Sequence, residues 1–122
     1  MIFIARNREQ VLSSDVIAEN EDVSKKYLDR ILMRLREANL LRSVKGQGGG
    51  YVLARPAGEI RTDEIIAALE GSLCLVECVD DPSACEKSGD CRTRRVWSRL
   101  AVAVKASLRA ISLEDLAHGE DA

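Results

Sequence analysis

The sequence predicts a mainly α-helical fold with a small β-wing, and three observations predict it. Apolar residues recur at helical spacing over residues 23–38, two short strand-like runs flank a glycine-rich turn, and a second helical pattern covers residues 93–112. The chain has 122 residues, of which 46% are hydrophobic and 31% charged. That is one small domain, and it leaves much surface that a partner could cover.

Two helices are expected near the N-terminus. The serine pair at 13–14 can cap a short helix that ends by Glu19, and the serine of the pair 23–24 opens a second helix that ends at Asn39. We assign Tyr27 to the core because it falls on the apolar stripe, although its hydroxyl could reach a phosphate. The stripe consists of Tyr27, Leu28, Ile31, Leu32, Leu35 and Ala38.

A hairpin and a third helix follow. Residues 41–44 and 51–54 are predicted to form two strands around a flexible basic tip, Lys45–Gly50. After a break at a proline and a glycine, two acidic residues in the first turn predict a helix from Thr62 to about Glu70.

The C-terminal half begins with a segment that has no sustained period, residues 74–91. It is too long and polar to stand in a compact domain unless something ties it down. A long amphipathic helix follows, and residues 113–122 form an acidic tail. The helix is marked by Val96, Trp97, Leu100, Ala103, Val104, Leu108 and Ile111.

The charge is unevenly distributed. The chain carries a net charge of −2, yet between Ser24 and Arg61 nine basic residues stand against three acidic ones. A short helix, a turn, a second helix with a polar outer face and a basic hairpin follow the order of a winged helix-turn-helix, whose second helix enters the DNA major groove. Glycines at the hairpin tip let backbone amides approach a phosphate. The alternative is a solvated helix face beside an ordinary turn.

Three of the four cysteines lie within 14 residues of one another, at Cys78, Cys85 and Cys91. Thiolates suit iron–sulfur clusters and zinc, which usually need four ligands. The spacing matches neither a zinc knuckle nor a common ferredoxin run, so the metal stays open, and inert thiols or a reversible disulfide are the alternative. Candidates for the fourth ligand are Glu77, Asp80, Asp81, Glu86, Asp90, Cys74 (otherwise a core residue), a second subunit and a small molecule.

Several classes of protein are disfavoured. No apolar run approaches the length of a membrane span, and apolar residues precede the first charge, which reverses the order of a secretory signal. The chain has one histidine, His118, and no P-loop, dinucleotide fingerprint or nucleophile elbow. We therefore expect a cytoplasmic protein that is not an enzyme and has no membrane partner.

Taken together, these residues resemble the IscR/NsrR-type (Rrf2) family of winged-helix transcription regulators of bacteria. The resemblance covers almost the whole chain. The motifs that carry it are Val16–Glu19, Ser24–Leu28, Leu40–Gly46, Gly48–Ala54, Ala67–Gly71, the three-cysteine loop and Trp97.

The resemblance implies a homodimer joined through the C-terminal helix, which binds palindromic double-stranded promoter DNA and holds an iron–sulfur cluster, 2Fe–2S or 4Fe–4S. That cluster would sense cluster supply, iron, oxygen or nitric oxide. By position, the DNA contacts are Ser24, Lys26, Asp29 and Lys45, and the cluster ligands are Cys78, Cys85 and Cys91. Their places in the second helix and hairpin tip add Lys25, Tyr27, Gln47 and Gly48 as candidate DNA-binding residues.

The expected organisation is a winged helix-turn-helix DNA-binding domain at residues 1–71, a cysteine-rich cluster-binding loop at 72–92, a dimerisation helix at 93–112 and the acidic tail at 113–122.

Two departures from the family stand out. Arg94 occupies the place where cluster-assembly regulators have a ligating histidine, so the fourth ligand cannot be carried over. Relatives have further helix upstream of Met1, which raises the expectation of a truncated start.

Two other functions stay open. The first is an iron–sulfur or zinc-binding interaction module whose basic face binds an acidic protein. The second is a cofactor-free repressor of cysteine metabolism. A thiol oxidoreductase is disfavoured because no closely spaced cysteine pair lies in a βαβ context.

Overall fold

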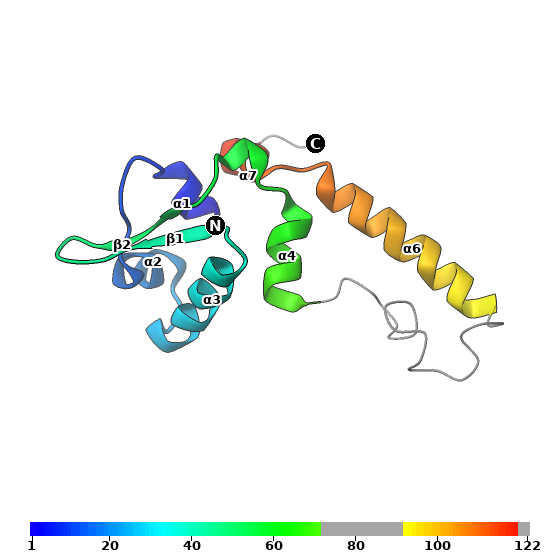
Figure 1. Cartoon of the computed structure of the whole chain (residues 1–122), viewed down its shortest axis with the longest axis horizontal. Coiled ribbons are helices and arrows are strands. Elements are labelled where there is room, and N and C mark those ends of the chain that lie inside the picture. The colour runs from blue at the N-terminus through cyan, green and yellow to red at the C-terminus, as the bar shows by residue number, and fades with distance from the viewer. Residues whose placement is uncertain (72–91, 120–122) are drawn as a thin grey trace.

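The computed structural model describes residues 1–71 and 92–119. Over these residues the fold is mainly helical with one two-stranded antiparallel sheet, which confirms the predicted fold class. Figure 1 shows the short helices and the sheet gathered into one body, from which a single long helix, α6, extends away. The elements are α1 (Ile2–Arg6), α2 (Ser14–Glu21), α3 (Lys25–Glu37), β1 (Leu41–Val44), β2 (Gly50–Leu53), the 3₁₀ turn η1 (Ala57–Glu59), α4 (Thr62–Glu70), α6 (Arg92–Arg109) and α7 (Leu113–His118).

One hydrophobic core holds the body together, and it draws residues from both ends of the chain. Ile4 of α1, Leu32 of α3, Ile60 before α4 and Leu113 of α7 are each at most 1% exposed. The buried apolar residues are Ile4, Ala5, Leu12, Ile17, Ala18, Leu28, Leu32, Leu35, Leu40, Leu41, Ala57, Ile60 and Leu113. Burial on this scale is the main source of stability for so small a domain.

The predicted serine caps form. The Ser13 hydroxyl accepts a hydrogen bond from the Val16 amide at 3.3 Å and begins α2, and the Ser24 hydroxyl accepts one from the Tyr27 amide at 3.2 Å and begins α3. Helix α2 runs two residues beyond its predicted end at Glu19 and stops at Asp22, which adopts the left-handed conformation. The two helices are therefore joined by a tight turn of three residues.

The wing is anchored to the segment before α2 through the half of β2 that lies nearer the hairpin tip. Strands β1 and β2 pair from Leu41 with Leu53 to Val44 with Gly50. Leu12 exchanges two backbone hydrogen bonds with Tyr51, of 3.2 and 2.8 Å. A Cβ atom at Gly50 would collide with the carbonyl oxygen of Leu12, so glycine permits this close approach.

Residues 113–118 correct one expectation, because they form helix α7 rather than an acidic tail. Ser112 and Asp115 exchange hydrogen bonds of 3.1 and 2.9 Å as a capping box, and the Ser112 amide holds the pKa of Asp115 below its usual range. The Arg6 guanidinium of α1 donates to the Ala117 carbonyl at 2.8 Å, and Leu113 is fully buried. Glu114 and Asp115, the acidic residues of this helix, are half-buried rather than fully solvated.

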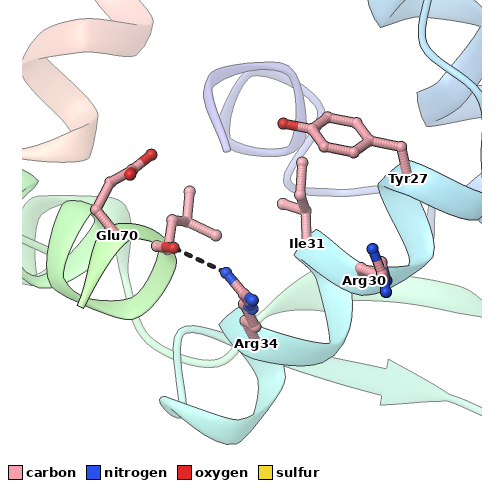
Figure 2. A pocket seen from close by; sticks show the side chains of 6 residues that line it. Tyr27, Arg30, Ile31, Arg34 and Glu70 are labelled. Atoms are coloured by element: carbon pink, nitrogen blue, oxygen red, sulfur yellow. Dashed lines mark hydrogen bonds between the residues drawn. The ribbon is translucent and has the colours of Figure 1, made fainter.

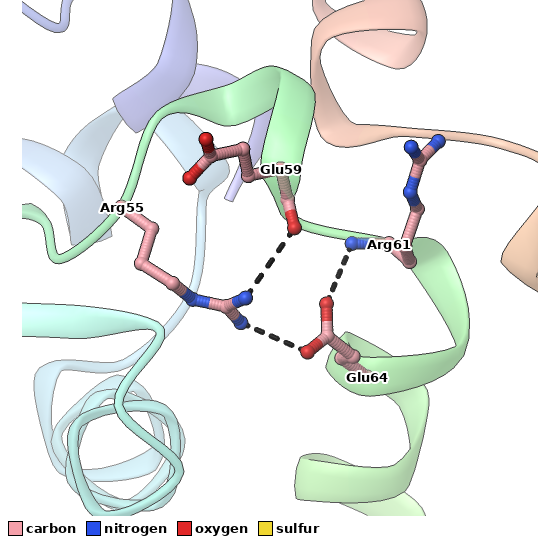
Figure 3. Close-up of polar contacts among 4 residues, drawn as sticks. All are labelled: Arg55, Glu59, Arg61 and Glu64. Carbon is pink, nitrogen blue, oxygen red and sulfur yellow. Dashed lines mark hydrogen bonds and ion pairs between the residues drawn. The ribbon is translucent and has the colours of Figure 1, made fainter.

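Helix α4 has the bounds that the sequence predicts, and a polar cluster fixes its start (Figure 3). Glu64 accepts a hydrogen bond from the Arg61 amide at 2.8 Å and forms an ion pair with Arg55 at 2.9 Å. Arg55 also donates to the Glu59 carbonyl at 3.3 Å. The cluster thereby ties the end of the wing to the first turn of α4.

The long C-terminal helix is present as predicted, from Arg92 to Arg109, with Ile111 beyond its end. It packs beside α4, yet none of its described residues is buried. Val96 is 63% exposed, Leu100 41% and Val102 70%. Within residues 1–71 and 92–119, no helix is long and apolar enough to cross a membrane.

Candidate nucleic-acid interface

The N-terminal end of α3 is built to attract anions. Ser24, Lys25 and Lys26 are exposed, and the first turn contains no acidic residue. The unpaired amides and the helix dipole at this end favour a negative group, and the two lysines add to the effect. The Ser24 hydroxyl accepts the capping hydrogen bond and still has its own proton to donate.

The exposed charged residues near the start of α3 differ in whether they form ion pairs. Lys25 forms an exposed ion pair of 3.2 Å with Asp15 of α2, which ties the start of α3 to the preceding helix. Lys26 and Arg30 are four residues apart and therefore neighbours on the outer face. Neither has an ion pair with any other residue in the described ranges. Asp29 is the acidic residue on the same exposed side.

Tyr27 is not a core residue, which corrects the assignment made from the apolar stripe. It is 58% exposed, because the core covers the centre of the stripe, at Leu28 and Leu32, and leaves its edge open. Figure 2 shows its ring extending past Ile31 over a hollow of about 240 Å³ between α3 and the end of α4. Its hydroxyl is therefore free to reach a ligand. The hollow is lined by Tyr27, Arg30, Ile31, Arg34, Leu69 and Glu70.

The wing tip presents a second set of predicted residues. Lys45, Gln47 and Gly48 are all exposed, and the Gly49 amide closes the turn on the Gly46 carbonyl at 3.0 Å. Gly46 and Gly48 have φ values of +102° and +76°, which residues with a Cβ rarely adopt. In Figure 1 the wing tip and the N-terminal end of α3 both lie at the side of the body away from α6.

The predicted cluster ligands cannot be placed in the same way. All four cysteines fall within residues 72–91, outside the described residues. In the ranges that are described, no group of three or more His, Cys, Asp or Glu side chains could hold a metal. Cys78, Cys85 and Cys91 therefore remain predictions.

Sequence reasoning missed two contacts that position α3. One is the ion pair between Lys25 and Asp15. The other is a hydrogen bond of 2.9 Å from the Arg34 guanidinium to the carbonyl oxygen of Leu69, 35 residues away. A charged residue on the outer face of a predicted helix gives no sign of a backbone partner so distant in sequence.

Two capped helices joined by a tight turn, followed by a two-stranded wing, define a winged helix-turn-helix protein. A family model described as "Rrf2: Iron-dependent Transcriptional regulator" matches residues 1–119. The chain belongs to the Rrf2 family of transcriptional regulators, and it is not an enzyme.

Relatives of known name support this membership. The chain is 35% identical to the HTH-type transcriptional regulator IscR of Xenorhabdus nematophila over 105 residues, which are 86% of this chain and 63% of that protein. It is also 35% identical to protein rrf2 of Nitratidesulfovibrio vulgaris over 108 residues, 88% of this chain and 72% of that protein. The chain thus spans somewhat less than two thirds of the length of the IscR relative.

Solved structures agree. The structure of CymR, the global cysteine regulator of B. subtilis, matches 98% of this chain and 88% of its own with a TM-score of 0.77 and 36% identity. The structure of T. potens IscR matches 94% of this chain and 75% of its own with a TM-score of 0.74 and 32% identity. These neighbours confirm the predicted winged-helix fold.

Proposed function

We propose that the protein regulates transcription by binding double-stranded promoter DNA through α3 and the wing. The observation that carries this proposal is the exposed, acid-free start of α3, which contains Lys25 and Lys26. This end of α3 lies on the same side of the body as the wing tip (Figure 1). A helix of 13 residues with such an end fits the major groove, while a hairpin tip with exposed glycines suits the adjacent phosphates.

Each candidate residue then has a definite role. Ser24 donates its hydroxyl proton to a phosphate, while Lys26 contacts phosphates or base edges. Asp29 accepts a hydrogen bond from a cytosine amino group, which makes it a residue that specifies sequence. At the wing, Lys45 and Gln47 contact the DNA backbone. The remaining contacts come from Lys25, which must leave or share Asp15, from the Tyr27 hydroxyl and from the Gly48 amide.

The proposed regulator acts as a homodimer joined through α6. That helix exposes Val96 and Leu100, four residues apart on one side, and extends away from the body (Figure 1). A second copy would cover this apolar surface. Paired long helices would hold two α3 helices about 34 Å apart, which is one turn of DNA, so the operator would be palindromic.

The finer proposal is that Cys78, Cys85 and Cys91 hold an iron–sulfur cluster of the 2Fe–2S or 4Fe–4S type, with a fourth ligand from elsewhere. Three soft thiolates in one short segment are the appropriate donors, and the matching family is described as iron-dependent. When bound, the cluster supplies iron that reacts with oxygen or nitric oxide. The chain's own contribution is to connect that segment to α4 and α6, which flank it.

A second candidate is a cofactor-free regulator, because the CymR structure matches nearly the whole chain. Anaerobic purification with visible and Mössbauer spectra, before and after Cys85→Ala, separates the two. Wild-type protein that remains colourless and iron-free after competent reconstitution would refute the cluster proposal and leave DNA binding intact.

DNA binding is tested by fluorescence anisotropy with a palindromic promoter fragment at several salt concentrations. We expect Lys45→Ala to weaken binding and to reduce the slope of log K against log salt by about one. The matched control is Lys105→Ala on α6, which should leave the slope unchanged. An unchanged slope for Lys45→Ala would refute the proposed contact between Lys45 and a phosphate. Wild-type protein with no salt-dependent affinity would refute the proposed function and favour an interaction module for an acidic protein.

A further inference from the structure

Arg34 of α3 caps the C-terminal end of α4. Its Nη1 atom donates to the carbonyl oxygen of Leu69 at 2.9 Å (Figure 2). Leu69 is the penultimate residue of α4, so its carbonyl is among the last four that have no partner within the helix. Helix α4 has no basic residue in its own last turn. Arg34 therefore supplies, from another helix, both the missing donor and the positive charge that a helix C-terminus favours.

This contact joins two segments with different tasks under the proposed function. Helix α4 ends at Glu70, and Gly71, with φ +77°, is the last described residue before the part of the sequence that contains Cys78, Cys85 and Cys91. At the other end of the contact, α3 carries the proposed DNA-reading residues. Among the described residues, one other polar side-chain contact joins α3 to a neighbouring element. It is the ion pair between Lys25 and Asp15, at the opposite end of α3.

The surroundings of Arg34 allow the contact to be made or broken without disturbing the core. Arg34 is exposed and lies at the hollow of about 240 Å³ beneath Tyr27, where solvent can replace the Leu69 carbonyl. Below it, Ile31 and Leu69 are partly buried and pack against the core. A small displacement of the last turn of α4 would therefore alter the hydrogen bond first.

We propose that Arg34 is a positioning residue that sets the orientation of α3 on α4 and transmits displacements of the end of α4 to the DNA-reading end of α3. This inference rests on the proposed function, because it assigns the route by which the cysteine segment affects DNA affinity. Arg34 does not need to touch DNA or the cluster to act in this way. Its contribution is measured as the difference in DNA affinity between the metal-free protein and the protein reconstituted with iron and sulfide.

The test compares Arg34→Met with Arg36→Met in the full chain. Methionine keeps an unbranched apolar stem but removes the guanidinium. Arg36 is the matched control because it lies on the same helix, is exposed, and its side chain has no hydrogen bond or ion pair with other residues of the described ranges. Fluorescence anisotropy gives the Kd for a promoter fragment with metal-free protein and with protein reconstituted anaerobically with iron and sulfide.

For wild-type protein we expect the two Kd values to differ about five- to tenfold, which is the change that one such hydrogen bond can carry. Arg36→Met should weaken binding in both states and keep this ratio. Arg34→Met should reduce the ratio to less than about twofold, although it removes the same charge. A merely structural role would change the two Kd values together, so a wild-type ratio in Arg34→Met would overturn the proposal.

Hydrogen–deuterium exchange of the metal-free protein provides a readout without DNA or cluster. The Gly71 amide donates to the Ala67 carbonyl at 3.0 Å in the last turn of α4. Arg34→Met should accelerate exchange of this amide severalfold, whereas Arg36→Met should not, and equal exchange in both variants would overturn the proposal. If wild-type protein shows equal Kd values in both states, the sensing part of the proposed function fails and the transmission proposed for Arg34 fails with it, even where the exchange result shows that Arg34 holds the last turn of α4.

Discussion

Glu64 at the first turn of α4 offers a quantitative test of how the wing is joined to the rest of the body. Its carboxylate accepts the Arg61 amide at 2.8 Å and pairs with Arg55 at 2.9 Å (Figure 3). The backbone hydrogen bond from Arg61 is the main cause that lowers the pKa of Glu64, and the Arg55 guanidinium adds to it. Replacing Glu64 by Gln removes the charge and keeps one acceptor oxygen.

The magnitude follows from the two contacts. The capping hydrogen bond is worth about 1 kcal/mol. The ion pair adds about 0.5 kcal/mol, because both side chains are more than a third exposed and solvent screens them. Since glutamine preserves part of the cap, we expect Glu64→Gln to lower the free energy of unfolding by about 1 kcal/mol at pH 7. For a chain of this size that corresponds to a Tm lower by about 4 °C.

The effect must depend on pH in one direction. A carboxyl whose pKa is lowered by folding stabilises the protein above its unfolded pKa, about 4.3 for glutamate, and loses that contribution as the pH falls through the folded pKa. The stabilities of wild-type protein and Glu64→Gln should therefore differ at pH 7, and the difference should shrink as the pH falls below about 4.3 and through the lowered folded pKa. Unfolding followed by circular dichroism at pH 7, 5 and 3, at a fixed protein concentration, measures this difference.

Glu59→Gln is the control, because the Glu59 carboxylate has no hydrogen bond or ion pair with the described residues and its backbone carbonyl still accepts from Arg55. A difference between wild-type protein and Glu64→Gln that is the same at all three pH values would refute the reasoning, as would an equal effect of Glu59→Gln.

Three further substitutions test other contacts. Gly50→Ala should cost about 1–3 kcal/mol and weaken DNA binding, because the new Cβ collides with the backbone of Leu12; an unchanged urea midpoint would contradict this. Ser24→Ala should lose about 1 kcal/mol with its cap, whereas Ser24→Asp should keep the stability and weaken DNA binding. Calorimetry and anisotropy together measure these effects, and full affinity in Ser24→Asp would argue against a phosphate at this position. Leu113→Ala should cost about 2–5 kcal/mol, since Leu113 is fully buried; a Tm within 1 °C of wild type would show that α7 adds little to the core.

The parts of the fold that could be predicted from sequence are those with local signals. Helix α4 begins at Thr62 with two acidic residues in its first turn and ends before Gly71, so each boundary is marked by the residues at that boundary. The starts of α2 and α3 are marked by serine caps in the same way.

The parts that could not be predicted depend on contacts between distant segments. Helix α1 has five residues, too few to show a period, and forms because Ile4 packs in the core beside α7. Ser112 and Asp115 form the capping box that begins α7, and this spacing of a serine and an acidic residue is visible in the sequence. The acidic composition of the segment nevertheless led to the prediction of a tail. Tyr27 has the right period for burial, yet no element reaches far enough to cover it.

In the candidate DNA-binding site, too, features with local sequence signals could be predicted, and features that depend on contacts between distant segments could not. The positions of Ser24, Lys26 and Lys45 on a helix end and a hairpin tip could be read from the sequence, because caps and glycines mark both places. Their roles toward DNA stay predictions, as do those of the three cysteines. The contact of Arg34 with Leu69 could not have been foreseen, because it depends on how α3 and α4 pack.

Because α7 packs back onto the body, a synthetic repressor built from this domain must include α7. Leu113 lies in the core and its amide donates to the Ile60 carbonyl at 2.8 Å. A chimaera cut after Gly71 would leave that part of the core open to water and prone to aggregate. A better module would replace the long helix with a short linker and retain residues 112–119 as its final segment.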